Sequence, residues 1–250
     1  MTIHPVATRT VPVGGVTINV REAGDPDGAT AILLHGGSSS AATWDRLAAS
    51  LTAAGHHVIA VDLRGHGGSS RTPDYPLSGY TDDIRGLMGT LGIESAALVG
   101  HSLGGYVASV LAQQEAARVT RLVLEEPGMP ARDSGSRHGL SGPRFMVPAL
   151  AGLAARRGFD RKAVASAIRQ LRVPDPVWWD RLRLITAPTL LISGGPSSHI
   201  PPQQLAAAAR AISRSRLVTI PAGHRVHSRS PEQFLSAVVP FLTDRAPKSP

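Results

Sequence analysis

The stretch that decides the fold is Leu98-Val99-Gly100-His101-Ser102-Leu103-Gly104-Gly105. It has the pattern of a short apolar strand that runs into a glycine-flanked serine, with a helix beginning directly afterwards. In such a G-x-S-x-G turn the serine is exposed above a sheet, and the small residues on either side let the backbone segments approach closely. Ser102 is therefore a candidate nucleophile. A tight turn with an incidental serine is the alternative.

Apolar runs alternate with helical segments along most of the chain. We expect strands at residues 6–12, 16–22, 31–34, 58–61, 96–99, 119–124, 189–192 and 217–220. We expect helices at residues 43–54 (capped by Thr43), 78–91, 103–114 and 231–242. This alternation predicts a mostly parallel sheet covered by helices on both faces. Ligands of such sheets bind beyond the carboxyl ends of the strands, where His35, Ser102, Glu126, Ser197 and His224 fall.

Residues 128–184 interrupt this alternation with helical segments at 144–157, 161–172 and 176–184. We interpret them as a helical cap over the strand ends, with 1–127 and 185–244 as the core and 245–250 as a flexible tail. An extra helical layer on the sheet is the alternative. Phe145 and Trp178 of the cap, with His35 of the core, are candidate substrate contacts. Packing of the cap onto the core is the simpler role for the two aromatic residues.

The composition narrows the choice of partners. The chain has 250 residues, 42% of them hydrophobic, and a formal charge of +8. Its positive charge is almost entirely arginine, and no basic recognition helix is visible, so we expect no nucleic-acid partner. No apolar run suits a membrane and no signal peptide is visible, so we expect a cytoplasmic monomer or homodimer that acts on a small molecule. Without cysteine or a ligand-spaced cluster of histidines and carboxylates, we expect no metal and no cofactor.

A serine hydroxyl needs a base and a group that stabilises the oxyanion. His224, on the loop after the last strand, is the candidate base, and it follows the serine in the order typical of this layout. Its neighbour His227 is expected to shape the loop. The backbone N–H groups of Leu103, at the start of a helix, and of Gly37, after the strand at 31–34, are the candidate oxyanion hole.

These motifs together resemble the α/β-hydrolase fold over about residues 6–242. The resemblance rests on His35-Gly36-Gly37, Asp62-Leu63-Arg64-Gly65-His66-Gly67-Gly68-Ser69, the Gly100–Gly105 stretch and Gly223-His224, in matching order. It implies an α/β fold with a mostly parallel eight-stranded sheet flanked by helices and a small helical cap. Serine at position 102, where epoxide hydrolases and haloalkane dehalogenases of this fold need a carboxylate, argues against those two classes.

The acid of the expected triad departs from the family pattern. Family members commonly carry it in Gly-x-x-Asp after the seventh strand, where this chain has Gly194-Gly195-Pro196-Ser197. Some relatives take the acid from the end of the sixth strand instead, where this chain has Glu125 and Glu126. Neighbouring strand residues point to opposite faces, so at most one of them meets the histidine, and an ungapped match favours Glu126. A protein without an orienting acid is the alternative.

The resemblance implies a cofactor-free serine hydrolase that cleaves an ester, lactone or thioester. Ser102 would attack, His224 would transfer the proton, and Glu126 or Glu125 would orient His224. Carbon–carbon bond hydrolysis, or a lyase or cyclase step with the same Ser-His pair, is a second enzymatic possibility. A non-catalytic small-molecule receptor is a third.

Overall fold

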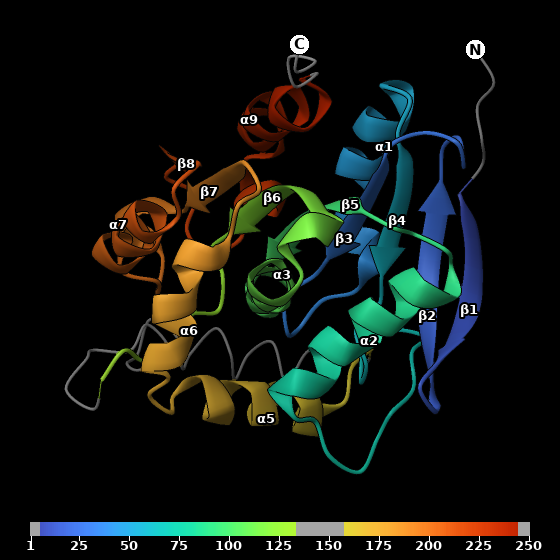
Figure 1. The fold of residues 1–250 in the computed structure, drawn as a ribbon, viewed down its shortest axis with the longest axis horizontal. Helices are drawn as coiled ribbons and strands as arrows, with labels where there is room; N and C mark the ends of the chain where they lie inside the picture. Colours follow the sequence, from blue (N-terminus) through green and yellow to red (C-terminus); the bar gives the residue numbers. More distant parts are fainter. Residues whose placement is uncertain (1–5, 134–157, 245–250) are drawn as a thin grey trace.

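A single sheet of eight strands runs through the molecule, as the computed structural model shows for residues 6–133 and 158–244 (Figure 1). The strand order is β1-β2-β4-β3-β5-β6-β7-β8. The β1–β2 and β2–β4 pairs are antiparallel and all other pairs are parallel. The strands are β1 (Ala7–Val13), β2 (Val16–Ala23), β3 (Thr30–Leu34), β4 (His57–Val61), β5 (Ala96–His101), β6 (Val119–Glu125), β7 (Thr189–Ser193) and β8 (Ser215–Thr219).

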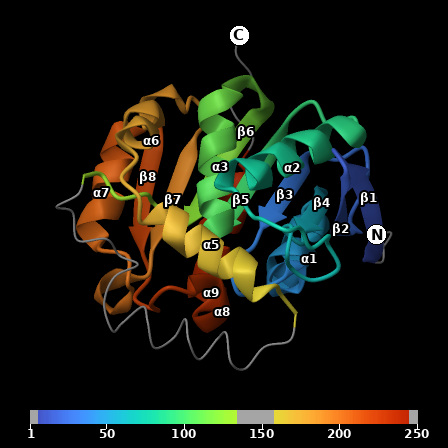
Figure 2. The same ribbon diagram turned by 90° about the horizontal axis from the view of Figure 1, so that it is seen from below.

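Helices cover both faces of this sheet (Figure 2). They are α1 (Asp45–Ala53), α2 (Leu77–Thr90), α3 (Leu103–Gln114), α5 (Arg161–Leu171), α6 (Pro176–Arg181), α7 (Pro202–Ala211), α8 (Val226–Arg229) and α9 (Pro231–Thr243). Alternate strand residues point to opposite faces. Thus Ile32 packs in the core under α2, α3 and α7, whereas Leu33 packs in the core under α1 and α9. The predicted two-sided α/β sheet is confirmed.

The register of the central strands brings their carboxyl ends level. Leu34 of β3 pairs with Gly100 of β5, which pairs with Leu124 of β6, which in turn pairs with Leu191 of β7. The loops that follow these strands therefore open at one edge of the sheet. The segments at residues 35–38, 102, 126 and 194–198 meet there, as the sequence predicts from the strand ends.

The described part of the proposed cap, residues 128–133 and 158–184, contains α5, α6 and a 3-10 turn (Leu182–Leu184). Helix α5 lies near the strand ends, since a Cβ on Gly65 would lie 2.7 Å from Ala163 Cβ. Helix α6 instead packs on α3, where Trp178 Nε1 donates to Ser109 Oγ at 3.2 Å. In the described part of the insertion, α5 therefore lies near the strand ends and α6 lies against α3, and the division into core and cap stays a prediction. The helical segment expected at 144–157 and the tail expected at 245–250 lie outside the described residues.

One expected helix start is wrong. Thr43 does not cap a helix, because a 3-10 turn (Ala41–Trp44) precedes α1 and no side chain caps it. The hydroxyl of Thr43 instead lies 2.8 Å from Nε2 of His227, far along the chain. A tertiary hydrogen bond has taken the place of the local cap that the residue type favours.

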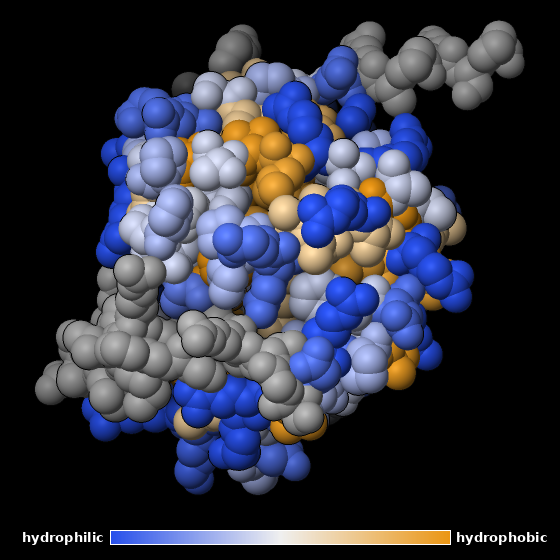
Figure 3. All heavy atoms as spheres, turned by 90° about the vertical axis from the view of Figure 1, so that its left-hand side faces the viewer, coloured by the Kyte–Doolittle hydropathy of each residue, from blue (hydrophilic) through white to orange (hydrophobic). Residues whose placement is uncertain are grey.

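The surface seen from the α6 and α7 side is largely hydrophilic, with smaller apolar areas between polar groups (Figure 3). Much of the positive charge of the insertion is solvent-exposed, on Arg161, Lys162, Arg169, Arg172, Arg181 and Arg183. In residues 6–133 and 158–244 no helix has both the length and the apolar character that a bilayer span requires.

Candidate active site

Ser102 lies on the sharp turn between β5 and α3, with φ and ψ of 50° and −114°. A left-handed conformation costs a non-glycine residue about 1–3 kcal/mol, so the surroundings must enforce it. A Cβ on Gly100 would lie 2.4 Å from the carbonyl oxygen of Gly104, and a Cβ on Gly104 would lie 2.2 Å from that of Leu34. The glycines of the motif are therefore sterically required, and they hold Ser102 at the carboxyl end of β5.

Glu126 is the one other non-glycine residue of the described chain with a positive φ, 46°. It follows β6 directly and its side chain is fully buried. The Gly194 N–H donates to its Oε1 at 2.6 Å, and the Ser198 hydroxyl donates to its Oε2. Nδ1 of His224 lies 3.3 Å from the same Oε2. The backbone kink thus places this carboxylate against the candidate base.

His224 lies on the loop after β8, and its side chain is 22% exposed. Nε2 of His101 lies 2.7 Å from the His224 carbonyl oxygen, and the two rings are 4.7 Å apart. Because His101 directly precedes Ser102, this contact holds the His224 loop beside the serine turn. In the described chain no hydrogen bond joins Ser102 to His224. Catalytic hydrogen bonds in free enzymes are often long and tighten when substrate binds.

Glu125 contacts a different histidine. Its carboxylate accepts the His227 backbone N–H at 2.9 Å, and its Oε2 lies 2.6 Å from His227 Nδ1. The His227 ring packs against Trp44 with 4.5 Å between the ring centroids and 35° between the ring planes. The structure therefore separates the two neighbouring carboxylates, and Glu126 alone of the pair contacts His224. His227 shapes the loop, as the sequence predicts.

Burial dominates the electrostatics of the pair. Burial raises the pKa of Glu126 to about 7, although the hydrogen bonds from Ser198 and Gly194 act in the opposite direction. Burial, together with the charges of Arg225 and His227, lowers the pKa of His224 to about 3. Above pH 7 the site therefore holds a carboxylate beside a neutral imidazole, which is the protonation state a general base requires.

The candidate oxyanion donors lie on both sides of the serine. Leu103 begins α3, so its N–H has no acceptor within the helix. A Cβ on Gly36 would lie 3.2 Å from Ser102 Cβ, which places the loop carrying Gly37 beside Ser102. The Gly37 carbonyl oxygen lies 2.7 Å from Nε2 of the buried His66 and is thereby held in place. This placement is compatible with the expected oxyanion hole.

His35 does not reach the site as a substrate contact. The side chain is fully buried, its Nδ1 lies 2.7 Å from the Gly36 carbonyl oxygen, and its Nε2 accepts the Leu63 N–H at 3.1 Å. Both ring nitrogens are thus occupied by the backbone, and burial lowers the pKa of His35 to about 3. We correct its expected role: His35 braces the loops after β3 and β4. Asp62 is a similar brace, and its carboxylate accepts the N–H groups of Ala41 and Gly68.

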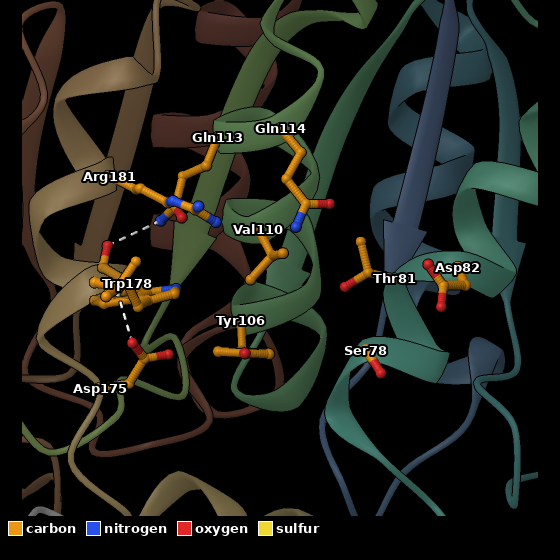
Figure 4. Close-up of a pocket in the computed structure, with 11 residues that line it drawn as sticks. Ser78, Thr81, Asp82, Tyr106, Val110, Gln113, Gln114, Asp175, Trp178 and Arg181 are labelled. Atoms are coloured by element: carbon orange, nitrogen blue, oxygen red, sulfur yellow. Dashed lines mark hydrogen bonds between the residues drawn. The ribbon is translucent and has the colours of Figure 1, made fainter.

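Trp178 is also placed away from Ser102. Its ring is stacked on Tyr106, and its indole N–H binds Ser109, about 10 Å along α3 from the serine. It lines a cavity of about 180 Å³ between α2, α3 and α6 (Figure 4). The described contacts of Trp178 pack α6 onto α3, and its expected contact with substrate stays a prediction. Phe145 lies outside the described residues.

Helix α5 brings apolar side chains close to the loops around Ser102. A Cβ on Gly37 would meet Val164 Cγ1 at 3.9 Å, and one on Gly128 would meet Leu171 Cδ1 at 3.0 Å. The Gly128 N–H donates to the Ser102 carbonyl oxygen at 2.8 Å. One face of α5 therefore extends over the serine turn from the loop after β3 to the loop after β6.

Comparison with known proteins decides the family. The sequence model of the alpha/beta hydrolase family matches residues 31–237. The chain belongs to this family. The strand order, the serine turn and the histidine loop of this α/β hydrolase all agree with that membership.

Several relatives match over most of their length. The chain is 30% identical to the 2-(acetamidomethylene)succinate hydrolase of Mesorhizobium japonicum over 270 residues, which covers 94% of this chain and 95% of the relative. It is 29% identical to the sn-1-specific diacylglycerol lipase of Mus musculus over 246 residues, which covers 84% of this chain and 80% of the relative. A crystal structure of E-2-(acetamidomethylene)succinate hydrolase superimposes with a TM-score of 0.80, 27% identity and coverage of 96% and 100%.

Two residues of this α/β hydrolase site had no signal in the sequence. Ser198 contacts Glu126, and the His199 ring lies 3.9 Å from the ring of His224. Both follow β7, in the loop where the family pattern directed attention to Ser197. Among the described residues no group of three or more histidines, carboxylates or cysteines is arranged to hold a metal ion.

Proposed function

We propose that this α/β hydrolase is a serine hydrolase that cleaves a carboxylic ester, lactone or thioester of a small molecule. The observation that carries the proposal is the 3.3 Å contact between His224 Nδ1 and Glu126 Oε2, beside the strained turn of Ser102. A carboxylate at Nδ1 fixes the imidazole tautomer and leaves Nε2 as the proton acceptor. The serine, the base and an orienting acid are then all assigned.

The acylation step follows from these roles. His224 Nε2 takes the proton of the Ser102 hydroxyl while Oγ bonds to the carbonyl carbon of the substrate. The carbonyl oxygen becomes an oxyanion, which the N–H groups of Gly37 and Leu103 stabilise. When the tetrahedral intermediate collapses, the bond to the leaving alcohol or thiol breaks, and the leaving group takes the proton from His224. Glu126 stays ionised and stabilises the imidazolium meanwhile.

Deacylation repeats the sequence with water. His224 takes a proton from water, the hydroxide oxygen bonds to the acyl carbon, and the bond to Ser102 Oγ breaks as the serine regains its proton. The product is a carboxylic acid. Because His224 returns each proton that it takes, the two steps need no cofactor.

The test is turnover by purified protein of a panel of p-nitrophenyl esters, lactones and thioesters, with 2-(acetamidomethylene)succinate included because of the relative named above. We expect hydrolysis of at least one carbonyl substrate and a loss of about 10⁶-fold in kcat for Ser102→Ala. Unchanged turnover in Ser102→Ala would refute the serine mechanism. Failure of the wild-type protein to incorporate ¹⁸O from labelled water into the acid product would favour a lyase or cyclase reaction instead.

A further inference from the structure

Ser198 occupies a buried position beside the candidate acid. Its side chain is only 6% exposed, and its own N–H donates to the Gly195 carbonyl oxygen at 3.0 Å. Its hydroxyl donates to Glu126 Oε2, and the same Oγ accepts the Ile200 N–H at 3.1 Å. These contacts fix both the backbone and the side chain of Ser198.

The direction of these hydrogen bonds matters. A serine hydroxyl has one proton to donate. Because the Ile200 N–H already points at Oγ, the hydroxyl proton is directed away from it and toward the Glu126 carboxylate. The series Ile200 N–H, Ser198 O–H and Glu126 Oε2 therefore runs in one direction and ends at the oxygen that contacts His224. Hydrogen bonds aligned in this way polarise and strengthen one another.

The loop after β7 contacts both oxygens of the carboxylate. The Gly194 N–H donates to Oε1 at 2.6 Å, and Ser198 donates to Oε2. The family resemblance expects the acid itself in this loop, at Ser197, but residues 194–200 contain no carboxylate. Ser197 is exposed, whereas Ser198 is buried. The loop thus supplies hydrogen-bond donors to an acid that comes from β6.

In the described part of the chain, titratable groups face Glu126 from the loops after β7 and β8 and from β6. His224 contacts it from the loop after β8, His199 lowers its pKa from the loop after β7, and Glu125 raises it from β6. The Ser198 hydroxyl is an uncharged donor among them, and it favours the ionised carboxylate because it hydrogen-bonds to that form. Its removal should therefore make the ionised form less stable.

We propose that Ser198 is a positioning residue that holds Glu126 in the orientation and ionised form in which Glu126 serves His224. The inference rests on the proposed function, because it assigns Ser198 a role through the acid of that triad. In this arrangement the loop after β7 supports a carboxylate that lies at the end of β6.

The experiment measures the rate at which a fluorophosphonate labels Ser102 between pH 5 and 9.5, in the wild type and in Ser198→Ala. Loss of a hydrogen bond to a charged group should move the acidic limb of the profile upward by about one pH unit. A shift of about one unit from a limb near 7 lowers the rate at pH 7 about fivefold and leaves the plateau at pH 9.5 nearly unchanged. A purely structural defect would lower the whole profile without moving its limb.

Matched variants complete the test. Ser197→Ala removes the exposed neighbouring hydroxyl, and its acidic limb should lie at the wild-type pH. Ser198→Thr retains a hydroxyl at the buried position, and its acidic limb should lie close to the wild-type pH. Should Ser198→Ala fail to fold, Ser198→Cys, with its weaker S–H donor, should give an intermediate shift. A limb in Ser198→Ala or Ser198→Cys that coincides with the wild type would overturn the inference. Absence of wild-type labelling would instead refute the proposed function, so the two failures are distinguishable.

Discussion

Glu125 and Glu126 are consecutive residues whose carboxylates contact different histidines. Glu125 Oε2 lies 2.6 Å from His227 Nδ1, whereas Glu126 Oε2 lies 3.3 Å from His224 Nδ1. The two carboxylates point in different directions for two reasons. Side chains alternate along a strand, and the backbone of Glu126, directly after β6, has a positive φ. The first pair joins α8 to the sheet, and the second faces the serine turn. Substitutions of the two glutamates should therefore have different effects.

Glu125→Gln should reduce stability more than activity. The change replaces a buried carboxylate that is hydrogen-bonded to His227, and we expect a loss of about 2–3 kcal/mol in the free energy of unfolding. The turnover of the folded fraction should stay within about fivefold of the wild type, because the pair does not contact His224. Urea denaturation and kcat, measured on the same preparations, check this. Loss of turnover at unchanged stability would contradict the assignment.

The same pair should contribute to stability against acid. Burial acts to raise the pKa of Glu125, but His101 and His227 hold it below its usual value. A carboxyl whose folded pKa is depressed stabilises the protein above its unfolded pKa and loses this contribution as the pH falls. The unfolding free energy of the wild type should therefore fall more steeply below pH 4.5 than that of Glu125→Gln. Parallel pH dependences of the two proteins would contradict this.

The pH–rate profile should have its acidic limb near pH 7. Burial raises the pKa of Glu126 to about 7 and lowers that of His224 to about 3. The active form has Glu126 ionised, so kcat/KM should fall as the pH drops through about 7. The limb should vanish in Glu126→Gln, whose residual activity should be flat from pH 5 to 9. If the acidic limb persists in Glu126→Gln, the group that titrates near pH 7 is not Glu126.

Gly37→Pro should impair catalysis through the backbone. The substitution removes one N–H of the expected oxyanion hole, and such a loss costs about 10²-fold in kcat. Gly37→Ala is the matched control, because it keeps the N–H and its Cβ would meet Val164 Cγ1 at an ordinary 3.9 Å. Circular dichroism of both variants checks folding. Equal kcat values for the two variants would show that the Gly37 N–H does not stabilise the oxyanion.

Trp178→Ala should destabilise the protein by about 3–5 kcal/mol, because it deletes a buried aromatic side chain. Trp178→Phe should lose less, since it preserves most of the contact with Tyr106. Neither variant should change KM by more than about twofold, because the ring lies away from Ser102. Thermal unfolding together with KM tests this. A large rise in KM at unchanged stability would instead indicate that Trp178 contacts the substrate, as expected from the sequence.

Much of the fold was predictable because its signals are local. The runs at residues 31–34 and 96–99 are continuous and apolar, as expected for strands buried on both faces, and the glycines at 100 and 104 follow from the contacts of a tight turn. The strand ends then predict which loops meet. His224 follows from the same reasoning, because its loop comes after the last strand.

The remaining features depend on tertiary contacts. The hydroxyl of Ser198 became part of the site because the loop after β7 folds back onto Glu126, and a serine in a Ser-Pro-rich loop carries no local mark of that contact. Thr43 has the residue type of a helix cap but binds His227 instead. His35 lies at a strand end as ligand-binding residues do, but it turns inward to the backbone.

The rate of covalent labelling of Ser102 by a fluorophosphonate tests the central claim most directly, because it reports the nucleophilicity of the serine without a known substrate. We predict a single adduct that peptide mass spectrometry assigns to Ser102. Its formation should be about 10³- to 10⁴-fold slower in Glu126→Gln and near the wild-type rate in Glu125→Gln. An unlabelled wild type, or equal labelling rates in Glu126→Gln and the wild type, would contradict the account.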